Sequence, residues 1–301
     1  MGDTYTAISV SNKHIYTYRK MKIVVSISGG KSSAYILANY PSDYAVFSLV
    51  RTNDKDCLYP DKKIRQIVSD KIGKEFIGTL EQDAIIKIVL ELEQFTGKKI
   101  DWISGDTFDE VIKTGGGLLP NMMRRYCTSN LKMFPIMKWW KQNINEVVKM
   151  SIGFRANETR RMNKIIEKCD ENGIESDKFI IGKRGKQNKW GMIKWRKPIF
   201  PLIENNILAD KIHRYWDNNK QVPFVKGYYN NCVGCFHRNP LFLKKMSEEH
   251  KNKMNWFAKQ EEIGKGKWKK EVLYKDIMKW NIQTELSFDD FSDCDSGYCG
   301  L

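Results

Sequence analysis

The sequence predicts an α/β fold, with a mostly parallel sheet that carries helices on both faces. Short apolar runs rich in β-branched residues alternate along the chain with longer segments whose apolar residues recur at helical spacing. Such alternation is typical of parallel sheets, in which a helix connects one strand to the next. With 301 residues and 41% hydrophobic content, the chain can form one large domain, or a core with an appendage.

The elements follow one another in a regular order. The first strand, at 23–25, enters a glycine-rich stretch and then a helix at 34–38. The later segments are a strand at 44–50, a helix at 62–72, a short strand at 74–78, a helix at 82–95, a strand at 100–104, a helix at 107–113, a strand at 146–152, a helix at 206–216 and a helix at 241–263. Residues 163–195 are charged and lack apolar periodicity, so we expect an insertion or a hairpin there.

The glycine-rich stretch is a candidate phosphate-binding turn. Its two glycines allow positive φ angles and a close approach of the backbone to a ligand. The N–H groups and the dipole of the following helix favour an anion, Lys31 adds a positive charge, and the serine hydroxyls can donate. The residues that we expect to bind are Ser26, Ser28, Gly29, Gly30, Lys31, Ser32 and Ser33. A Walker A loop fits less well, because its first glycine would fall at Val25, and an ordinary glycine turn is the other alternative.

A polar turn ends the second strand, with Asn53 and Asp54 in it. Ligands of doubly wound sheets sit at the carboxyl ends of the strands. Either residue is therefore a candidate contact for a ribose or an adenine, and a plain turn is the alternative.

A basic turn with one cysteine spans residues 124–136 and enters a helix that continues through Trp140. Arg124, Arg125 and Lys132 lie near Cys127 in the sequence, and such cations favour a thiolate. The alternative is that Cys127 is a small buried apolar residue.

A second basic segment, 153–161, follows the strand at 146–152 directly. Gly153 would let the backbone approach a ligand. The guanidinium groups of Arg155, Arg160 and Arg161 are candidate clamps for phosphate or sulfate, because their planar forks match tetrahedral anions. A basic helix N-terminus without a ligand is the alternative.

The seven cysteines indicate metal or redox chemistry, because an odd number in a protein that we expect in the cytoplasm argues against structural disulfides. Cys232 and Cys235 form a C-x-x-C pair, whose two sulfurs can face one metal. One assignment is a [4Fe–4S] cluster held by Cys127, Cys232, Cys235 and a tail cysteine or an open iron. The other is Zn²⁺ held by Cys232, Cys235, Cys294 and Cys299. We expect Cys57 and Cys169 to be free.

Five of these segments, in this order, resemble the phosphoadenylyl-sulfate (PAPS) reductase-like group of the ATP-pyrophosphatase (PP-loop) superfamily. The resemblance covers most of residues 21–301. SGGKSS resembles the pyrophosphate loop, and RYCT with the later Lys132 and Pro135 resembles a cysteine-containing K-x-x-P element. GFRANETRR resembles G-x-R-x-x-E-[ST]-x-R, and the segment 197–203 resembles a YPL segment with Phe200 in the place of the tyrosine. The fifth segment is C-x-x-C.

The resemblance implies a Rossmann-like (HUP-type) fold with a cysteine-rich C-terminal appendage. It also implies that the chain binds ATP, PAPS or adenylyl sulfate (APS) with Mg²⁺, for adenylation and sulfur transfer or for reduction of a sulfonucleotide. Lys31 and Arg155 would act in catalysis, and Asn53, Gly153 and Arg160 would contact the nucleotide. Cys299 is similar to the nucleophile of the terminal E-C-G-[IL]-H, although this chain lacks the Glu and the His. Because Cys127 belongs to a family-like motif, the resemblance favours the [4Fe–4S] cluster over Zn²⁺.

We expect three parts: an extension at 1–20, a PP-loop nucleotide-binding domain at 21–205, and a helical region with the C-x-x-C pair and the cysteine-rich tail at 206–301. The net charge of +15 fits a polyanionic partner, which is an adenine nucleotide and, beyond it, nucleic acid or a sulfur-donor protein. A non-catalytic nucleotide-binding, metal-stabilised subunit of a nucleic-acid-modification or defence complex is the alternative. No apolar run approaches the ~20 residues of a membrane span, and residues 1–20 lack the apolar core of a signal peptide. We therefore expect a cytoplasmic protein without membrane contact.

Overall fold

The computed structural model describes residues 21–185, 187–225 and 232–281. The expected extension at 1–20 and the tail that carries Cys294 and Cys299 lie outside the described residues. In the part that is described, no helix is long and apolar enough to cross a membrane.

A six-stranded sheet forms the centre of the molecule, with the strand order β5-β2-β1-β6-β8-β7. All neighbours are parallel except β7 and β8, which are antiparallel. The strands are β1 Ile23–Ile27, β2 Tyr44–Ser48, β5 Ile100–Ile103, β6 Val148–Ser151, β7 Glu175–Arg184 and β8 Gln187–Ile199. The prediction of an α/β fold with a mostly parallel sheet is confirmed.

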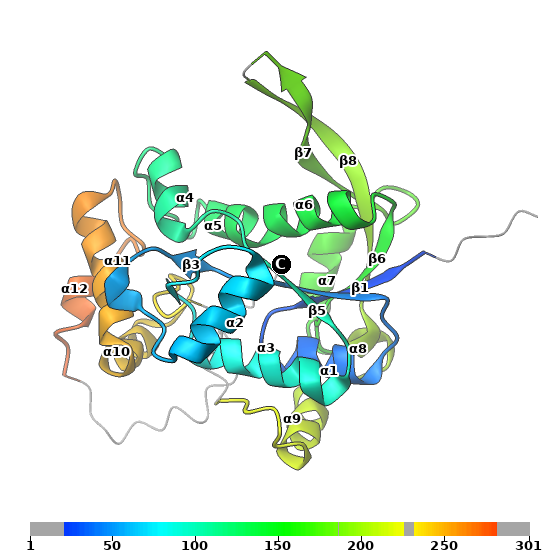
Figure 1. Cartoon of the computed structure of the whole chain (residues 1–301), viewed down its shortest axis with the longest axis horizontal. Helices are drawn as coiled ribbons and strands as arrows, with labels where there is room; N and C mark the ends of the chain where they lie inside the picture. The colour runs from blue at the N-terminus through cyan, green and yellow to red at the C-terminus, as the bar shows by residue number, and fades with distance from the viewer. Residues whose placement is uncertain (1–20, 186, 226–231, 282–301) are drawn as a thin grey trace, which may run out of the picture.

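Helices cover both faces of this sheet (Figure 1). Alternate residues of β1 point in opposite directions, so Val25 and Ile27 join one apolar cluster and Val24 joins another. The first cluster contains residues of α1 Lys31–Asn39, α2 Lys62–Ile72, α3 Asp83–Thr96 and α9 Ala209–Asn218. The second contains residues of α6 Phe134–Asn143. A parallel sheet buried on both faces explains why its strands read as continuous apolar runs.

A third apolar cluster joins the C-terminal helices to the carboxyl side of the sheet. It contains residues of α4 Phe108–Thr114, α10 Pro240–Glu249, α11 Lys251–Ile263 and α12 Tyr274–Ile277. The remaining helices are α5 Tyr126–Thr128, α7 Thr159–Ile166, α8 Pro201–Glu204, the 3₁₀ turn η1 Lys55–Cys57 and the π-helical turn η2 Ser129–Met133. The helical segment expected at 241–263 is two helices that meet at His250.

One expected strand is placed differently. The strand predicted at 74–78 is β4 Gly78–Thr79, which pairs antiparallel with β3 Arg51–Thr52 in a separate two-stranded sheet. A Cβ on Gly78 would lie 1.8 Å from the carbonyl oxygen of Cys57, so only glycine permits this pairing. The strand expected at 44–50 therefore ends at Ser48, before the chain enters the small sheet.

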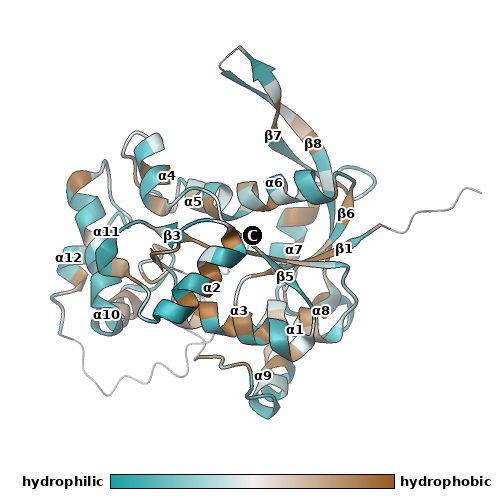
Figure 2. Ribbon diagram, viewed as in Figure 1, coloured by the Kyte–Doolittle hydropathy of each residue, from teal (hydrophilic) through white to brown (hydrophobic). Residues whose placement is uncertain are grey.

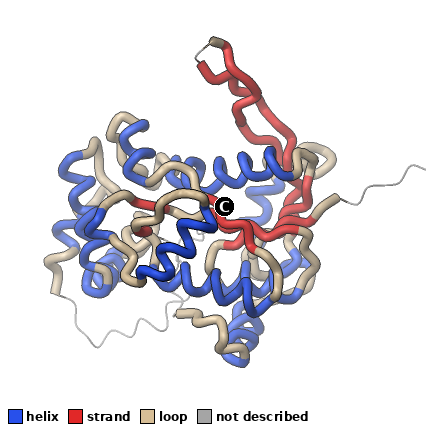
Figure 3. Tube along the Cα trace, viewed as in Figure 1, coloured by secondary structure: helices blue, strands red, loops and turns tan. Residues whose placement is uncertain are grey.

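The segment expected as an insertion or a hairpin is a long antiparallel ribbon, β7–β8, that projects from the edge of the sheet (Figure 3). The base of β8 pairs with β6 from Arg196 to Ile199. Next to this base, Phe179 and Trp195 are buried in the second apolar cluster. The described residues from Ile181 to the turn and back to Trp190 are exposed and mostly hydrophilic (Figure 2).

Candidate functional site

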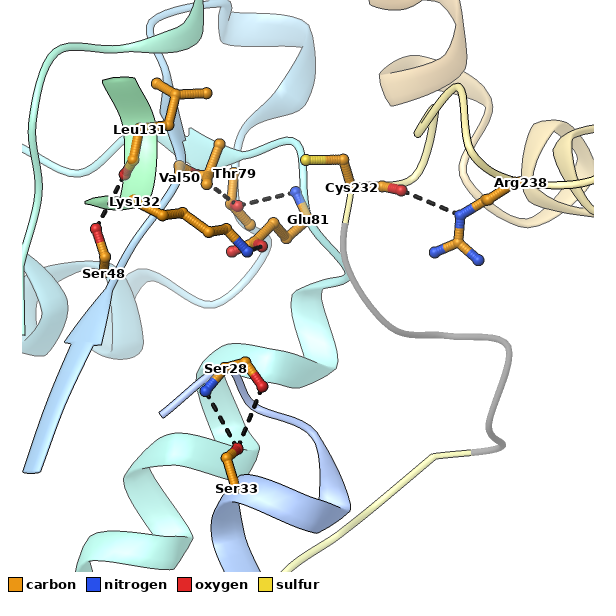
Figure 4. A network of polar contacts seen from close by, with 10 residues as sticks. All are labelled: Ser28, Ser33, Ser48, Val50, Thr79, Glu81, Leu131, Lys132, Cys232 and Arg238. Atoms are coloured by element: carbon orange, nitrogen blue, oxygen red, sulfur yellow. Dashed lines mark hydrogen bonds and ion pairs between the residues drawn. The ribbon is translucent and has the colours of Figure 1, made fainter. Parts of the chain in front are cut away.

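The glycine-rich loop connects β1 to α1 with the geometry that the sequence predicts. Gly29 has φ +76°, and a Cβ on it would lie 2.5 Å from Cγ2 of Ile85 on α3. The Ser33 hydroxyl accepts a hydrogen bond from the Ser28 N–H at 3.2 Å (Figure 4). It also donates to the Gly30 carbonyl at 3.1 Å. This side chain therefore holds the turn closed from inside and leaves the outer side of the loop to a ligand.

The backbone donors at the start of α1 have no acceptor within the described part of the protein. Gly30 is the N-cap residue and makes no side-chain cap. The N–H groups of Gly30, Lys31 and Ser32 have no hydrogen-bond partner among the residues that the structure describes. Because the first N–H groups of a helix carry the positive end of its dipole, this turn favours an anion.

Gly153 brings a second backbone segment against the loop. It follows β6, which lies beside β1 in the sheet and runs parallel to it. A Cβ on Gly153 would lie 3.1 Å from the Ser33 nitrogen and 3.4 Å from Cβ of Ser32. Only a hydrogen at this position leaves the approach to the loop unobstructed, as the sequence predicts for a residue beside a ligand.

Lys31 stands at the entrance of α1 and is tied to the fold through its backbone. Its carbonyl accepts a hydrogen bond from the indole N–H of Trp216 on α9 at 3.0 Å. Its ammonium group has no acidic partner among the described residues, so its charge is available to an anion at the loop.

Glu158 organises the arginines after β6. Its carboxylate accepts from the Arg155 backbone at 2.8 Å and Nε at 3.1 Å, and from Arg161 Nη1 at 2.5 Å. Burial raises the pKa of Glu158, but the Arg155 N–H and the two guanidinium charges outweigh burial and place the pKa below its usual range. The guanidinium of Arg161 also stacks over Phe154, at 4.1 Å from the ring centre. Arg160, by contrast, is exposed at the start of α7.

Two expected contacts lie outside the loop itself. Ser26 is inside β1, paired with Val46, so it is a strand residue beneath the turn. Asn53 is exposed after β3, where its N–H donates to Asp109 of α4 and its amide to Thr107, the N-cap residue of α4. The structure gives neither side chain a contact with residues 28–33.

A buried ion pair links the loop region to the cysteines, and the sequence did not reveal it. Lys132 Nζ lies 2.8 Å from Glu81 Oε1, with the side chains 19% and 2% exposed (Figure 4). Burial opposes the charge on Lys132, but the Glu81 carboxylate raises its pKa, so the lysine is charged. The other oxygen, Oε2 of Glu81, is buried without a hydrogen-bond partner in the described part of the chain.

Cys232 joins the same network through the backbone. It forms a β-bridge with Glu81, and its carbonyl accepts from Arg238 Nε at 3.1 Å (Figure 4). The Cys235 N–H donates to the Cys232 carbonyl at 3.2 Å, which gives the C-x-x-C segment its tight turn. Gly234 is required there, because a Cβ would lie 2.4 Å from the Phe257 ring.

Three cysteine thiols from two separate segments interact electrostatically. Cys127, Cys232 and Cys235 are close enough for each charge to affect the ionisation of another. We expected the nearby cations to favour a Cys127 thiolate, and this is wrong for the chain without metal. Burial and the Cys235 charge raise the pKa of Cys127 to about 11, against the smaller opposite effects of Thr128 and Arg125. Burial also raises the pKa of Cys232.

The described residues do not contain a complete metal site. Within them, no group of three or more His, Cys, Asp or Glu side chains is arranged to hold a metal ion, and Cys57, Cys127, Cys169, Cys232 and Cys235 are all free of disulfides. The other expected ligands, Cys294 and Cys299, lie outside the described residues, so the choice between the cluster and Zn²⁺ stays a prediction.

Comparison with protein-family models found no match, and comparisons with curated proteins and with solved structures found none either.

Two acidic residues of the site were missed by the sequence reasoning. Glu158 carries a signal, since it is three residues from both Arg155 and Arg161, the spacing at which side chains meet on a helical turn. Glu81 carries none, because its partner Lys132 is 51 residues away.

Proposed function

We propose that this chain is a Rossmann-like, PAPS-reductase-like PP-loop enzyme that binds ATP or a sulfonucleotide at residues 28–33. The observation that carries the proposal is the turn itself. Its N–H groups at Gly30, Lys31 and Ser32 have no partner within the described residues, and Gly153 leaves the approach to them open. Such a turn at the carboxyl edge of a parallel sheet suits a pyrophosphate.

Each residue has a role that follows from its position. The loop N–H groups would bind phosphate oxygens, and Lys31 would add a point charge. Arg155, held by Glu158, would meet a phosphate or sulfate at the neighbouring strand end. Arg160 would act as an exposed, more mobile contact. Ser26, Asn53 and the second arginine, Arg161, support the site from positions further from the loop.

With ATP, the reaction would be adenylation. An acceptor oxygen attacks the α-phosphorus, the bond between that phosphorus and the bridging oxygen to the β-phosphorus breaks, and pyrophosphate leaves. The turn and Lys31 would hold the charge that develops on pyrophosphate, and Mg²⁺ would share it when bound. A sulfur nucleophile would then displace AMP from the adenylate. With PAPS or APS, the thiolate of Cys299 would instead attack the sulfur, and the nucleotide phosphate would leave. A second thiol, from a thiol reductant, would then attack the Cys299 sulfur, so that sulfite leaves and a disulfide forms.

The three thiols fit a [4Fe–4S] cluster in part. Cys127, Cys232 and Cys235 affect one another's ionisation, and the charges of Lys132 and Arg238 interact with Cys232 and Cys235. Cations beside the ligands suit a cluster that carries a net negative charge with its thiolates. A fourth ligand would come from Cys294 or Cys299, and with both of them and without Cys127 the set would suit Zn²⁺. The cluster would supply electronic and structural stabilisation close to the loop.

Titration calorimetry with ATP, APS and PAPS tests the proposal. We expect heat with at least one of them, and about 10- to 100-fold weaker binding by Lys31→Ala, because a charge-assisted hydrogen bond contributes about 1.5–3 kcal/mol. The matched control is Lys62→Ala, since Lys62 is exposed on α2. Wild-type protein that binds none of the three nucleotides would contradict the proposal.

Two activity assays separate the reactions. Exchange of labelled pyrophosphate into ATP marks adenylation, and release of sulfite that is lost in Cys299→Ser marks reduction. Nucleotide binding without either activity favours the second candidate, a non-catalytic, metal-stabilised subunit of a nucleic-acid-modification or defence complex. The observation that favours this candidate is the net charge of +15, which fits a polyanionic partner such as nucleic acid.

A further inference from the structure

The β7–β8 ribbon has an unusual charge. From Glu175 to Ile199 it contains eight basic residues and two acidic ones, Glu175 and Asp177, both near the start of β7. The basic residues are Lys178, Lys183, Arg184, Lys186, Lys189, Lys194, Arg196 and Lys197. Every described residue from Ile181 to Trp190 is exposed. This outer part of the ribbon, which projects from the sheet in Figure 1, therefore presents its charged side chains to solvent.

Acidic partners neutralise only the base of the ribbon. Lys194 pairs with Asp170 at 2.6 Å, and Arg196 pairs with the buried Glu175 at 2.7 Å. Further out, Lys183, Arg184 and Lys189 have no acidic partner among the residues that the structure describes. The outer half of the ribbon is therefore a concentrated and uncompensated positive charge, which a polyanion would complement.

Apolar and amide groups accompany these cations. Trp190 is 46% exposed and Met192 is 68% exposed, and the ammonium of Lys178 lies 5.8 Å from the centre of the Trp190 ring. Gln187 and Asn188 are exposed beside the turn. One face of Trp190 packs against Phe134 of α6, with ring centres 6.0 Å apart, and the rest of its ring is exposed together with Met192. Amides that donate and accept, together with apolar groups that can contact thymine methyls, are the residue types that read base edges in DNA.

The shape of the ribbon selects among polyanions. Two paired strands lie ~4.8 Å apart, and the major groove of B-form DNA, ~12 Å wide, admits a two-stranded ribbon with its side chains. The major groove of A-form RNA is too narrow to admit one. A bulge between Ile180 and Gly182 adds to the right-handed twist of the two strands, which helps them follow a curved groove.

We propose that the β7–β8 ribbon is a docking arm for duplex DNA, which enters the major groove and contacts the phosphates on either side through Lys183, Arg184 and Lys189. The arm contributes no residue to the loop at 28–33, so this inference does not depend on the proposed nucleotide chemistry.

The test is fluorescence anisotropy of the full chain with a labelled 30-base-pair DNA, repeated over a series of salt concentrations. We expect the triple variant K183A/R184A/K189A to bind at least ten-fold more weakly. Its slope of log affinity against log salt should fall by about 2.7, because each lost phosphate contact removes about 0.9. Trp190→Ala should weaken binding without changing this slope, since it removes no charge.

The control triple K62A/K63A/K87A removes the same charge from exposed positions on α2 and α3. It should keep wild-type affinity within about twofold. Equal losses in the two triple variants would overturn the proposal, because the charge alone and not the ribbon would then explain binding. Wild-type protein that binds duplex RNA as tightly as DNA, or binds no DNA, would overturn it too.

A melting curve of K183A/R184A/K189A checks that it folds. Since the three side chains are exposed and outside the apolar clusters, we expect an unchanged melting temperature. The single variant Lys189→Ala, with a slope lowered by about 0.9, keeps the proposal testable if the triple variant is unstable.

Discussion

Lys132 Nζ lies 2.8 Å from Glu81 Oε1, and this contact connects the turn that carries Cys127 to the strand segment that pairs with Cys232. Both partners are largely buried, and Glu81 also accepts, through its backbone carbonyl, a hydrogen bond from Lys253 Nζ at 2.7 Å. Glu81 therefore connects three other segments of the chain, through Lys132, Lys253 and Cys232.

Removing one partner of this pair should be costly. Lys132→Met leaves the Glu81 carboxylate buried without its counter-ion, so we expect a loss of about 3–5 kcal/mol in the free energy of unfolding. The double variant Lys132→Met/Glu81→Leu should recover much of that loss, because no charge then stays buried. Urea unfolding measures all three proteins. Additive losses in the double variant would contradict the role of the ion pair.

Gly29→Ala should destabilise the protein more than Gly73→Ala. Both glycines have positive φ, +76° and +63°, so both substitutions carry the left-handed backbone cost of about 1–2 kcal/mol. Only at Gly29 does the new Cβ also meet Ile85, at 2.5 Å, whereas nothing lies within 4 Å of the position at Gly73. Thermal unfolding measures the difference. Adding Ile85→Ala to Gly29→Ala removes the Cγ2 atom that the new methyl group meets, so the double variant should lose less than the sum of the two single losses. Equal losses at the two glycines would rule out the contact.

Gly153→Ala should weaken nucleotide binding by about tenfold with little effect on stability. The added methyl group lies 3.1 Å from the Ser33 nitrogen and narrows the approach to the loop, while the backbone at Gly153 does not require glycine for its φ angle. Calorimetry with the nucleotide that the wild type binds measures the effect. Gly182→Ala is the matched control, because no atom lies within 4 Å of its added Cβ and it is remote from the loop. If Gly153→Ala bound the nucleotide with wild-type affinity, the nucleotide would not lie between Gly153 and the loop at 28–33.

Glu158 should stabilise the fold in a pH-dependent way. Its folded pKa is below the ordinary value of 4.5, so its contribution is fully present above about pH 4.5 and is lost as the pH falls through the lower, folded value. Glu158→Gln should therefore be less stable than the wild type at pH 7, and the difference should shrink when urea unfolding is repeated below pH 4. A difference that does not change with pH would show that the charge of Glu158 contributes nothing.

Metal binding should require the C-x-x-C pair, Cys232 and Cys235. If a [4Fe–4S] cluster is bound, protein purified without oxygen should contain iron and sulfide and show a broad absorption band in the visible blue, and Cys232→Ser should abolish both. Cys169→Ser is the control, since Cys169 lies at the far side of β6 from these thiols, in a bridge with Glu175. Colourless wild-type protein with one zinc would exclude the cluster.

The local parts of this fold could be predicted from the sequence. The turn at Gly29 and Gly30 follows from a β-branched run, two glycines and a helix, all within 17 residues of Ile23–Asn39. The small β3–β4 sheet could not be predicted, because it depends on Gly78 fitting against the Cys57 carbonyl, a contact across 21 residues. Neither could the Glu81–Lys132 pair, since spacing along the chain carries no signal for partners that only tertiary packing brings together.

Tertiary pairing also limits how much of the candidate site could be predicted from the sequence. Gly153 was found because it follows a strand that neighbours β1, and parallel strands place their ends together. Asn53 was expected at the same edge for the same reason, but the chain leaves the large sheet after Ser48 and carries Asn53 to α4. The pairing of β3 with β4 thus separates Asn53 from Gly153, although both follow a strand in the sequence.

The turn of the β7–β8 ribbon is also a suitable site for attaching a label. Its turn at Gly185 lies far from every buried cluster, and the strands there pair only with each other. A short epitope or a dye attachment site inserted at this turn should leave the sheet, the glycine loop and the cysteines in place. A fluorescent dye at that position would then report the binding of a partner to the β7–β8 ribbon without changing the rest of the fold.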